Sequence, residues 1–155
     1  LWRPVQTPLD KVALCSPLIV ARGWFPAGRY LYQLLRPFVK QLARGTARSS
    51  HDQAFNDFVM NKDPLQAQFL SLRWVGAMKQ WHRRFQQLAP LQKPLLLVQG
   101  TGDMTVDWRY NLPLIQRKLP NTKPVLVADA GHQLVNETPE YRDQVLKAVS
   151  DYFAV

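Results

Sequence analysis

The sequence predicts an α/β fold in which a small parallel sheet is flanked by helices and interrupted by a helical insert. After residue 90, apolar strand patterns alternate with helical patterns, which is typical of parallel strands joined by right-handed crossovers. The 155 residues are 46% hydrophobic, enough for one domain with a real core. The longest apolar runs fall short of the ~20 residues that a membrane-spanning helix needs.

Three segments with different patterns follow one another along the chain: residues 1–20, 21–90 and 91–155. The first contains a short apolar run, Lys11–Ser16, which we expect to form a strand of the core sheet. Pro17 ends this run because proline lacks the backbone N–H that a ladder requires.

The second segment, residues 21–90, is predicted to be a cap of helices and loops inserted into the core. Its apolar residues recur at helical spacing, and no β-alternation interrupts them. Asp63 is predicted to cap a new helix, with Pro64 at the first helical position. The residues that show the helical spacing are Ala54, Phe55, Phe58, Val59, Leu65, Phe69, Leu70, Leu72, Trp74, Val75 and Met78.

The third segment, residues 91–155, is predicted to complete the core. Pro94–Gln99 reads as a strand buried on both faces, and Val125–Ala128 as a second strand. Between them, Trp108–Leu119 can bury one side of a helix, and the final helix is expected to start at Thr138. Together with the first segment, this gives about three parallel strands.

Most of the positive charge lies in the insert. The net charge is +9, and residues 22–90 hold eleven Lys or Arg against three acids, which accounts for +8 of it. The charge can mark an ordinary solvated helical face, or an anionic membrane or phospholipid surface, where each basic residue adds about 1 kcal/mol. No nucleic-acid recognition motif accompanies it, so we expect no nucleic-acid partner.

Asp103 and His132 each follow a predicted strand by a few residues. Because the carboxyl ends of parallel strands meet at one edge of a sheet, we expect these two side chains to lie together. A carboxylate there can orient an imidazole for general-base work. Asp107 fits a helix cap better, and Asp129 is a rival acid that precedes His132 too closely to come from another strand.

The motifs around these two residues resemble a known family. Gly100-x-x-Asp103-x-x-Val106, followed by Ala130-Gly131-His132 and then Asn136-Glu137, is similar to the C-terminal half of an α/β-hydrolase of the monoacylglycerol lipase and lysophospholipase type, in the serine aminopeptidase-like branch. The similarity extends to three stretches of the first two segments, Val12–Pro17, Asp63–Leu65 and Arg73–Trp74.

This resemblance implies a capped serine hydrolase that cleaves carboxylic esters. The expected substrates are acyl esters of lysophospholipids or monoacylglycerols, with Asp103 as the acid and His132 as the base of a Ser-His-Asp triad. It implies no cofactor and a location in the cytoplasm or at the membrane periphery. A peptidase or another esterase of the same fold remains open, as does a non-catalytic basic binding module or pseudoenzyme.

The nucleophile elbow Gly-x-Ser-x-Gly does not occur in the sequence. In the family that the chain resembles, the elbow and the oxyanion donors precede the point where this sequence begins. We therefore expect residues 1–155 to be the C-terminal part of a longer enzyme and to be inactive alone. The five serines, none of which lies between two glycines at the elbow spacing, are Ser16, Ser49, Ser50, Ser71 and Ser150.

An exposed edge at Lys11–Ser16 is expected to cause self-association or pairing with the missing N-terminal part. Cys15, the single cysteine, is expected to be a buried thiol and allows no internal disulfide. His51 and His82 have no acidic partner at helical spacing, so we expect both at the surface. Neither belongs to a recognisable metal-binding pattern.

Overall fold

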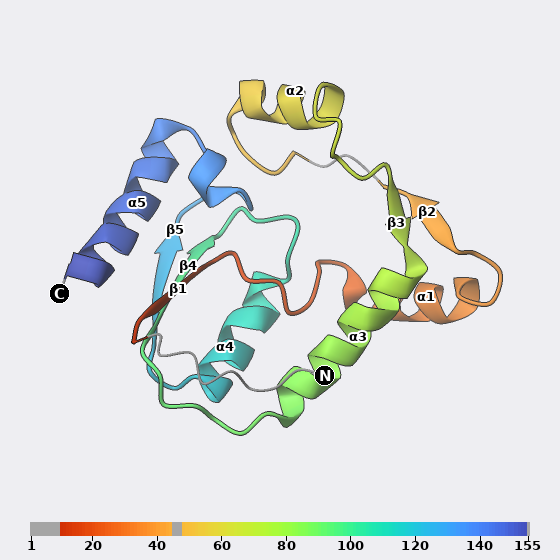
Figure 1. Ribbon diagram of the computed structural model, residues 1–155, viewed down its shortest axis with the longest axis horizontal. Coiled ribbons are helices and arrows are strands. Elements are labelled where there is room, and N and C mark those ends of the chain that lie inside the picture. Colours follow the sequence, from red (N-terminus) through yellow and green to blue (C-terminus); the bar gives the residue numbers. More distant parts are fainter. Residues whose placement is uncertain (1–9, 45–47, 155) are drawn as a thin grey trace.

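The core of the protein is a three-stranded parallel sheet in the order β1-β4-β5. The structure is a computed structural model that describes residues 10–44 and 48–154; residues 1–9 of the predicted first segment, 45–47 of the predicted cap and Val155 lie outside it. The strands are β1 (Val12–Cys15), β4 (Leu95–Gly100) and β5 (Thr122–Val127). This sheet confirms the predicted α/β class (Figure 1).

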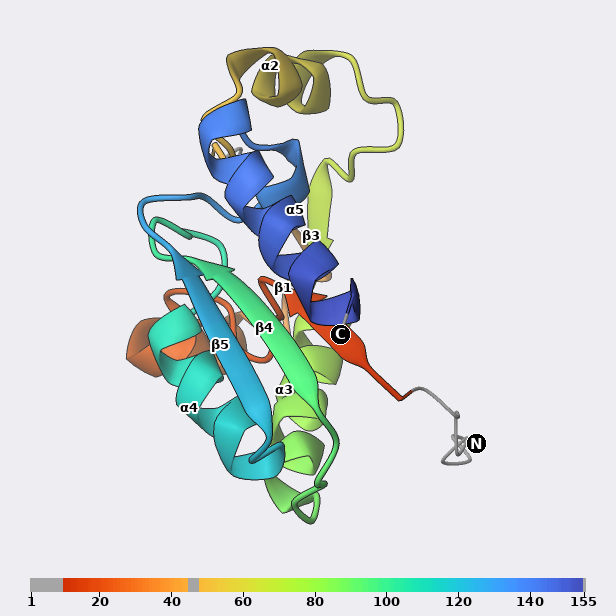
Figure 2. The same ribbon diagram turned by 90° about the vertical axis from the view of Figure 1, so that its left-hand side faces the viewer.

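Two helices cover opposite faces of the sheet, α4 (Trp108–Lys118) on one and α5 (Pro139–Ala154) on the other (Figure 2). The central strand β4 is buried along its whole length, which explains why its sequence is continuously apolar. Successive residues of β4 point to opposite faces of the sheet, and each face has its own hydrophobic cluster. Leu97 packs on the side of Ile115 in α4, and Val98 packs on the side of Val145 in α5.

The predicted strand boundaries differ modestly from the observed ones. β5 begins at Thr122, three residues before the predicted start, although Pro124 lies inside it. Within the described residues β1 pairs with β4 alone and forms an edge of the sheet, in the register Val12↔Leu95. The prediction of a buried Cys15 is wrong: this residue is exposed, because it ends the edge strand.

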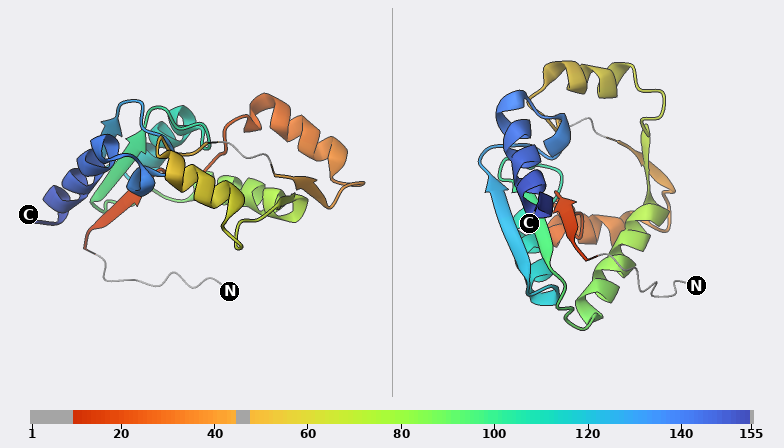
Figure 3. Two further views of the ribbon diagram at one scale, coloured as in Figure 1. Left: turned by 90° about the horizontal axis from the view of Figure 1, so that it is seen from above. Right: turned by 60° about the vertical axis from the view of Figure 1, so that its left-hand side comes forward.

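The chain between β1 and β4 forms the cap, which extends to one side of the sheet (Figure 3). No described helix, in the cap or in the core, is long and apolar enough to span a membrane. The elements of the cap are η1 (Trp24–Gly28), α1 (Arg29–Leu35), β2 (Gln41–Ala43), α2 (Gln53–Asn61), β3 (Phe69–Ser71) and α3 (Leu72–Gln87).

The cap contains a small antiparallel sheet that the sequence pattern did not predict. β2 pairs with β3, with Gln41 opposite Ser71 and Ala43 opposite Phe69. Each strand has three residues, too few to show an alternating pattern, and their pairing spans α2. The prediction of an all-helical insert without strands is therefore wrong.

The predicted helix start at Asp63 is also wrong. The Leu65 N–H donates to Asp63 Oδ1 at 2.9 Å, and this bond closes a turn rather than opening a helix. The helix α3 begins only at Leu72, directly after β3. By contrast, the helix predicted around Ala54 to Val59 is present as α2, and Asp52 caps it through a 2.9 Å bond from the Phe55 N–H.

The segment that leaves β1 is fixed to α4 before it enters the cap. Asn111 of α4 is buried, and its side chain bonds both backbone groups of Val20 at 3.0 Å. Ala21 then forms a β-bridge with Val106. These contacts attach the base of the cap to the loop that follows β4.

Candidate catalytic site

Asp103 lies in the loop after β4, three residues beyond Gly100, where the end of the strand delivers its carboxylate into the core. Only 1% of this residue is exposed. Its Oδ1 accepts from the backbone N–H groups of Thr105 at 2.7 Å and Val106 at 3.0 Å. Its Oδ2 accepts from Gln99 Nε2 at 3.0 Å, so both oxygens have donors.

The structure brings His132 into contact with Asp103, as the spacing of the two strands predicted. His132 lies in the loop after β5, and its Nδ1 is 2.9 Å from Asp103 Oδ2. The His132 side chain is 22% exposed, whereas that of Asp103 is fully buried. One ring edge is therefore held by a buried acid while the ring keeps access to the surface.

The two loops approach each other closely through their backbones. The Gly102 N–H donates to the Ala130 carbonyl oxygen at 3.0 Å. A Cβ at Gly102 would overlap the carbonyl of Asp129, so only glycine permits this approach. The relative position of Asp103 and His132 is thereby fixed by main-chain contacts and not by their side chains alone.

Asp103 is held in its ionised form. Burial raises the pKa of its carboxyl group, but hydrogen bonds from His132, Val106, Thr105 and Gln99 together bring that pKa below its ordinary value. An ionised carboxylate can only accept, so His132 Nδ1 carries the proton in this contact. In the neutral imidazole this tautomer leaves the lone pair on Nε2, on the ring edge opposite Asp103.

The other aspartates near the site have different roles. Asp107 caps α4, accepting from the Tyr110 N–H at 3.2 Å, as its position before the helix indicated. Asp129 is exposed and has a positive φ of 59°. Within the described part of the chain, His132 makes its side-chain hydrogen bond with Asp103 and not with Asp129 or any serine.

The surface position expected for His51 is confirmed, since its side chain is 49% exposed, whereas the same expectation for His82 is wrong, and both rings have partners. His82 is 9% exposed, and its Nε2 lies 2.8 Å from the Tyr110 hydroxyl; burial lowers the pKa of this imidazole. His51 is paired with Glu137, at 3.1 Å between Nδ1 and Oε1. Both partners are far away in the sequence, so helical spacing could not reveal them.

Glu137 is a second buried acid beside the histidine loop, with 1% of the residue exposed. Its Oε1 accepts from the Gly131 N–H at 2.6 Å, and its Oε2 accepts from the His51 N–H at 2.7 Å. Burial raises the pKa of Glu137, but the hydrogen bonds and the charge of the His51 side chain bring it below the ordinary value. Sequence reasoning placed Glu137 in the family motif but assigned it no contact.

An apolar cavity of ≈ 250 Å³ lies within the cap, between residues 18–24 and helices α1 and α3. Leu31, Trp74 and Met78 are among its lining residues, while Asp103 and His132 are not. One wall of the cavity is connected to the acid loop, because the Arg22 N–H donates to the Thr105 carbonyl at 3.0 Å.

Over the residues that the structure describes, no group of three His, Cys, Asp or Glu side chains is arranged to hold a metal ion. The acid–imidazole pair is the titratable pair that the two loops bring together. Such a pair can take a proton from a hydroxyl and return it, provided that a nucleophile is supplied.

Comparison with known proteins identifies the fold. A family model described as alpha/beta hydrolase fold matches residues 67–137, which include both Asp103 and His132. The order of the parallel strands and the acid followed by histidine agree with this match. The chain has the α/β-hydrolase fold, as its motifs predicted.

Two solved structures show the same likeness over most of the chain. One is a soluble variant of monoglyceride lipase from Saccharomyces cerevisiae in complex with a substrate analog: TM-score 0.74, 17% identity, covering 92% of this chain and 54% of that one. The other is monoacylglycerol lipase from Paleococcus ferrophilus: TM-score 0.69, 18% identity, covering 92% and 58%. This chain thus spans little more than half the length of either. A search of curated proteins gave no match.

Proposed function

We propose that the protein containing this chain is a serine hydrolase of carboxylic esters. The observation that carries the proposal is the contact between buried Asp103 and His132, 2.9 Å between Oδ2 and Nδ1, at the end of a parallel sheet. This acid and base occur in the chain order of the α/β-hydrolases. The serine would come from sequence outside these 155 residues, which contain no nucleophile elbow.

In the proposed mechanism, His132 Nε2 takes the proton of the serine hydroxyl as its oxygen attacks the ester carbonyl. The same nitrogen then returns the proton to the leaving alcohol, and the cycle repeats with water on the acyl-enzyme. Asp103 holds the imidazole in the required tautomer and stabilises the imidazolium that forms. Its lowered pKa keeps the negative charge available throughout.

Acyl esters of lysophospholipids or monoacylglycerols are the substrates we propose. The apolar cavity of ≈ 250 Å³ in the cap supports a long acyl chain as part of the substrate. The solved structures that the chain resembles are monoglyceride lipases, which supports the same class. Peptidase activity and other esterase activity remain alternatives within this mechanism.

A basic groove in the cap supports an anionic lipid surface as partner. Arg29, Lys79 and Arg83 line a groove of ≈ 580 Å³ together with the aromatic rings of Trp24 and Phe25. Among the described residues, none of the three cations is in a salt bridge. We propose that this groove faces the membrane or phospholipid aggregate from which the substrate is drawn, with the protein peripheral to it.

The test is to react the full-length protein with a fluorophosphonate probe and to measure hydrolysis. We expect one labelled serine, and we expect Asp103→Asn to lower kcat by about 10⁴-fold because His132 adopts the wrong tautomer. Asp129→Asn, which alters an exposed acid of the same region, is the matched control and should retain activity. A folded wild-type protein that is never labelled would exclude the hydrolase and leave a non-catalytic binding module.

A substrate panel then separates the enzyme classes. Lysophospholipids, monoacylglycerols and aminoacyl amides should be compared by kcat/KM on the same preparation. We expect the acyl esters to give the highest kcat/KM. Preference for the amides would instead assign the protein to the peptidases of this fold.

A further inference from the structure

A network of hydrogen bonds joins the cap to the loop that carries His132. On the cap side are residues 49–56, which include the first turn of α2, and on the core side are residues 131–137. The Gln133 N–H donates to the Ser49 carbonyl at 2.9 Å, and Ser50 Oγ donates to the Asn136 carbonyl at 2.7 Å. Two segments more than 80 residues apart in sequence thus share a hydrogen-bonded seam.

Glu137 is the centre of this seam. One carboxylate oxygen binds the Gly131 N–H, directly before His132, and the other binds the His51 N–H and, at 3.2 Å, Ser50 Oγ. The His51 ring adds a contact at 3.1 Å and packs on Tyr141, with ring centroids 4.9 Å apart. A single buried anion therefore bonds to both the histidine loop and the cap.

The backbone leaves little freedom at this point. A Cβ on Gly131 would lie 2.6 Å from the Ser49 carbonyl oxygen and 2.8 Å from Glu137 Oε1. The backbone of Gly131, directly before His132, is therefore packed against both the 49–51 segment and Glu137. A buried carboxylate with several charge-assisted hydrogen bonds is also costly to displace.

We propose that Glu137 is a positioning residue for His132, and that it couples the placement of the cap to the geometry of the Asp103–His132 pair through His51 and Ser50. This inference rests on the proposed hydrolase function. It adds that the cap does more than form a substrate cavity: its 49–56 segment holds the general base in place. Moving the cap away from the core would break the bonds of Glu137 to His51 and Ser50, and Glu137 would then hold the Gly131–His132 loop less firmly.

The test uses Glu137→Gln and His51→Ala in the full-length protein, with Glu140→Gln as the matched control. Glu137→Gln keeps an acceptor for Gly131 but presents an amide N–H to the His51 N–H, so it breaks the bond to the cap. We expect kcat to fall between about 10- and 100-fold with KM nearly unchanged, since a misplacement of about 1 Å can cost about 100-fold. His51→Ala, which removes only the ring contact, should act in the same direction and more weakly.

The second readout is the proton NMR signal of the His132 Nδ1–H bonded to Asp103, identified by its loss in His132→Ala. It should shift or broaden in both seam variants and stay unchanged in Glu140→Gln. This signal does not require turnover, so it tests the positioning role even if the hydrolase function fails. If Glu137→Gln does not fold, His51→Ala decides by the same criteria, because its ring is 49% exposed.

A different outcome would overturn the proposal. If the seam variants lower the thermal midpoint but leave kcat per folded molecule and the His132 signal as in the wild type, Glu137 only stabilises the fold. An effect confined to KM would likewise assign it to substrate binding and not to positioning.

Discussion

Asp103 and Glu137 are both buried acids, and each is stabilised as an anion by donors of the protein rather than by water. An unpaired carboxylate at such a depth would be neutralised by a raised pKa. Here the donors reverse that effect, and they come from β4, from the loops after β4 and β5, or from the cap. The residues that organise the site therefore also contribute to the stability of the fold.

The stability of the protein should fall in acid because of these two groups. Their folded-state pKa values lie below the unfolded values, so their contribution is complete above the ordinary carboxyl range and is lost as the pH falls through the lowered values. Urea unfolding between pH 7 and pH 3 should show this decline. In Asp103→Asn the free energy of unfolding should depend less steeply on pH over this range. A variant whose free energy of unfolding falls as steeply as that of the wild type would contradict the assignment.

The sequence predicted the acid and base of the site but not the groups that hold them. Asp103 and His132 could be found because each follows an apolar strand, and parallel strands end at one edge. Gln99 lies inside β4, where its apolar neighbours gave no sign of a polar role, and it is nevertheless buried against Asp103. His51 and Glu137 are 86 residues apart, so local sequence patterns cannot reveal that they are in contact.

At the scale of elements, the core was predictable, whereas in the cap the helix α2 was predicted and the two short strands were not. Strands β1, β4 and β5 and helices α4 and α5 have long or strongly apolar patterns that tertiary contacts do not override. The strands β2 and β3 depend on each other across α2, and their three residues each carry no period. Helical spacing through residues 65–78 therefore predicted a helix where the chain first forms a turn and a strand.

Helix α4 gives a prediction at this scale because its start supports the acid loop. Asp107 accepts from the Tyr110 N–H, and Asp107→Ala should lower the free energy of unfolding by about 1 kcal/mol. Asp107→Asn retains a capping oxygen and should lose much less. Chemical denaturation of both variants measures the difference; equal losses would show that the charge and not the cap bond is responsible.

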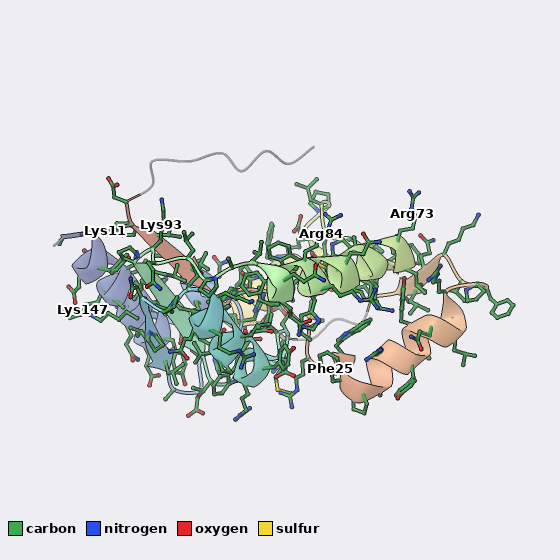
Figure 4. All side chains as sticks on the ribbon, turned by 90° about the horizontal axis from the view of Figure 1, so that it is seen from below. Lys11, Phe25, Arg73, Arg84, Lys93 and Lys147 are labelled. Atoms are coloured by element: carbon green, nitrogen blue, oxygen red, sulfur yellow. The ribbon has the colours of Figure 1, made fainter. Side chains whose placement is uncertain are left out.

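Over the whole molecule, positive charge and apolar rings are concentrated in the cap. Arg73 and Arg84 lie along α3 and Phe25 beside the start of α1, whereas Lys11, Lys93 and Lys147 belong to the core end (Figure 4). Phe25 contacts His82 and Tyr110, at 5.9 and 5.5 Å between ring centroids, so the rim of the basic groove is built partly on α4. The cap is thus the face that we propose for contact with an anionic lipid surface.

Vesicle binding tests this arrangement. The protein should bind vesicles containing anionic phospholipid and release them as salt is raised, because each basic residue near such a surface contributes about 1 kcal/mol. Lys79→Gln combined with Arg83→Gln should weaken partitioning by about tenfold or more. Lys147→Gln, in a side chain bonded to Asp151 on α5, is the matched control. Equal binding to neutral vesicles would refute an electrostatic role.

The pairing of β1 with β4 encloses the whole cap in one loop of the chain. The entropy of closing a loop grows only with the logarithm of its length, about 0.6 kcal/mol per doubling, so the size of the cap has little effect on the thermodynamic cost of completing the sheet. The order of folding is affected more. β4 and β5 are joined through α4 alone, so their pairing can form early. The pairing of β1 with β4 can form only when the two ends of the cap come together.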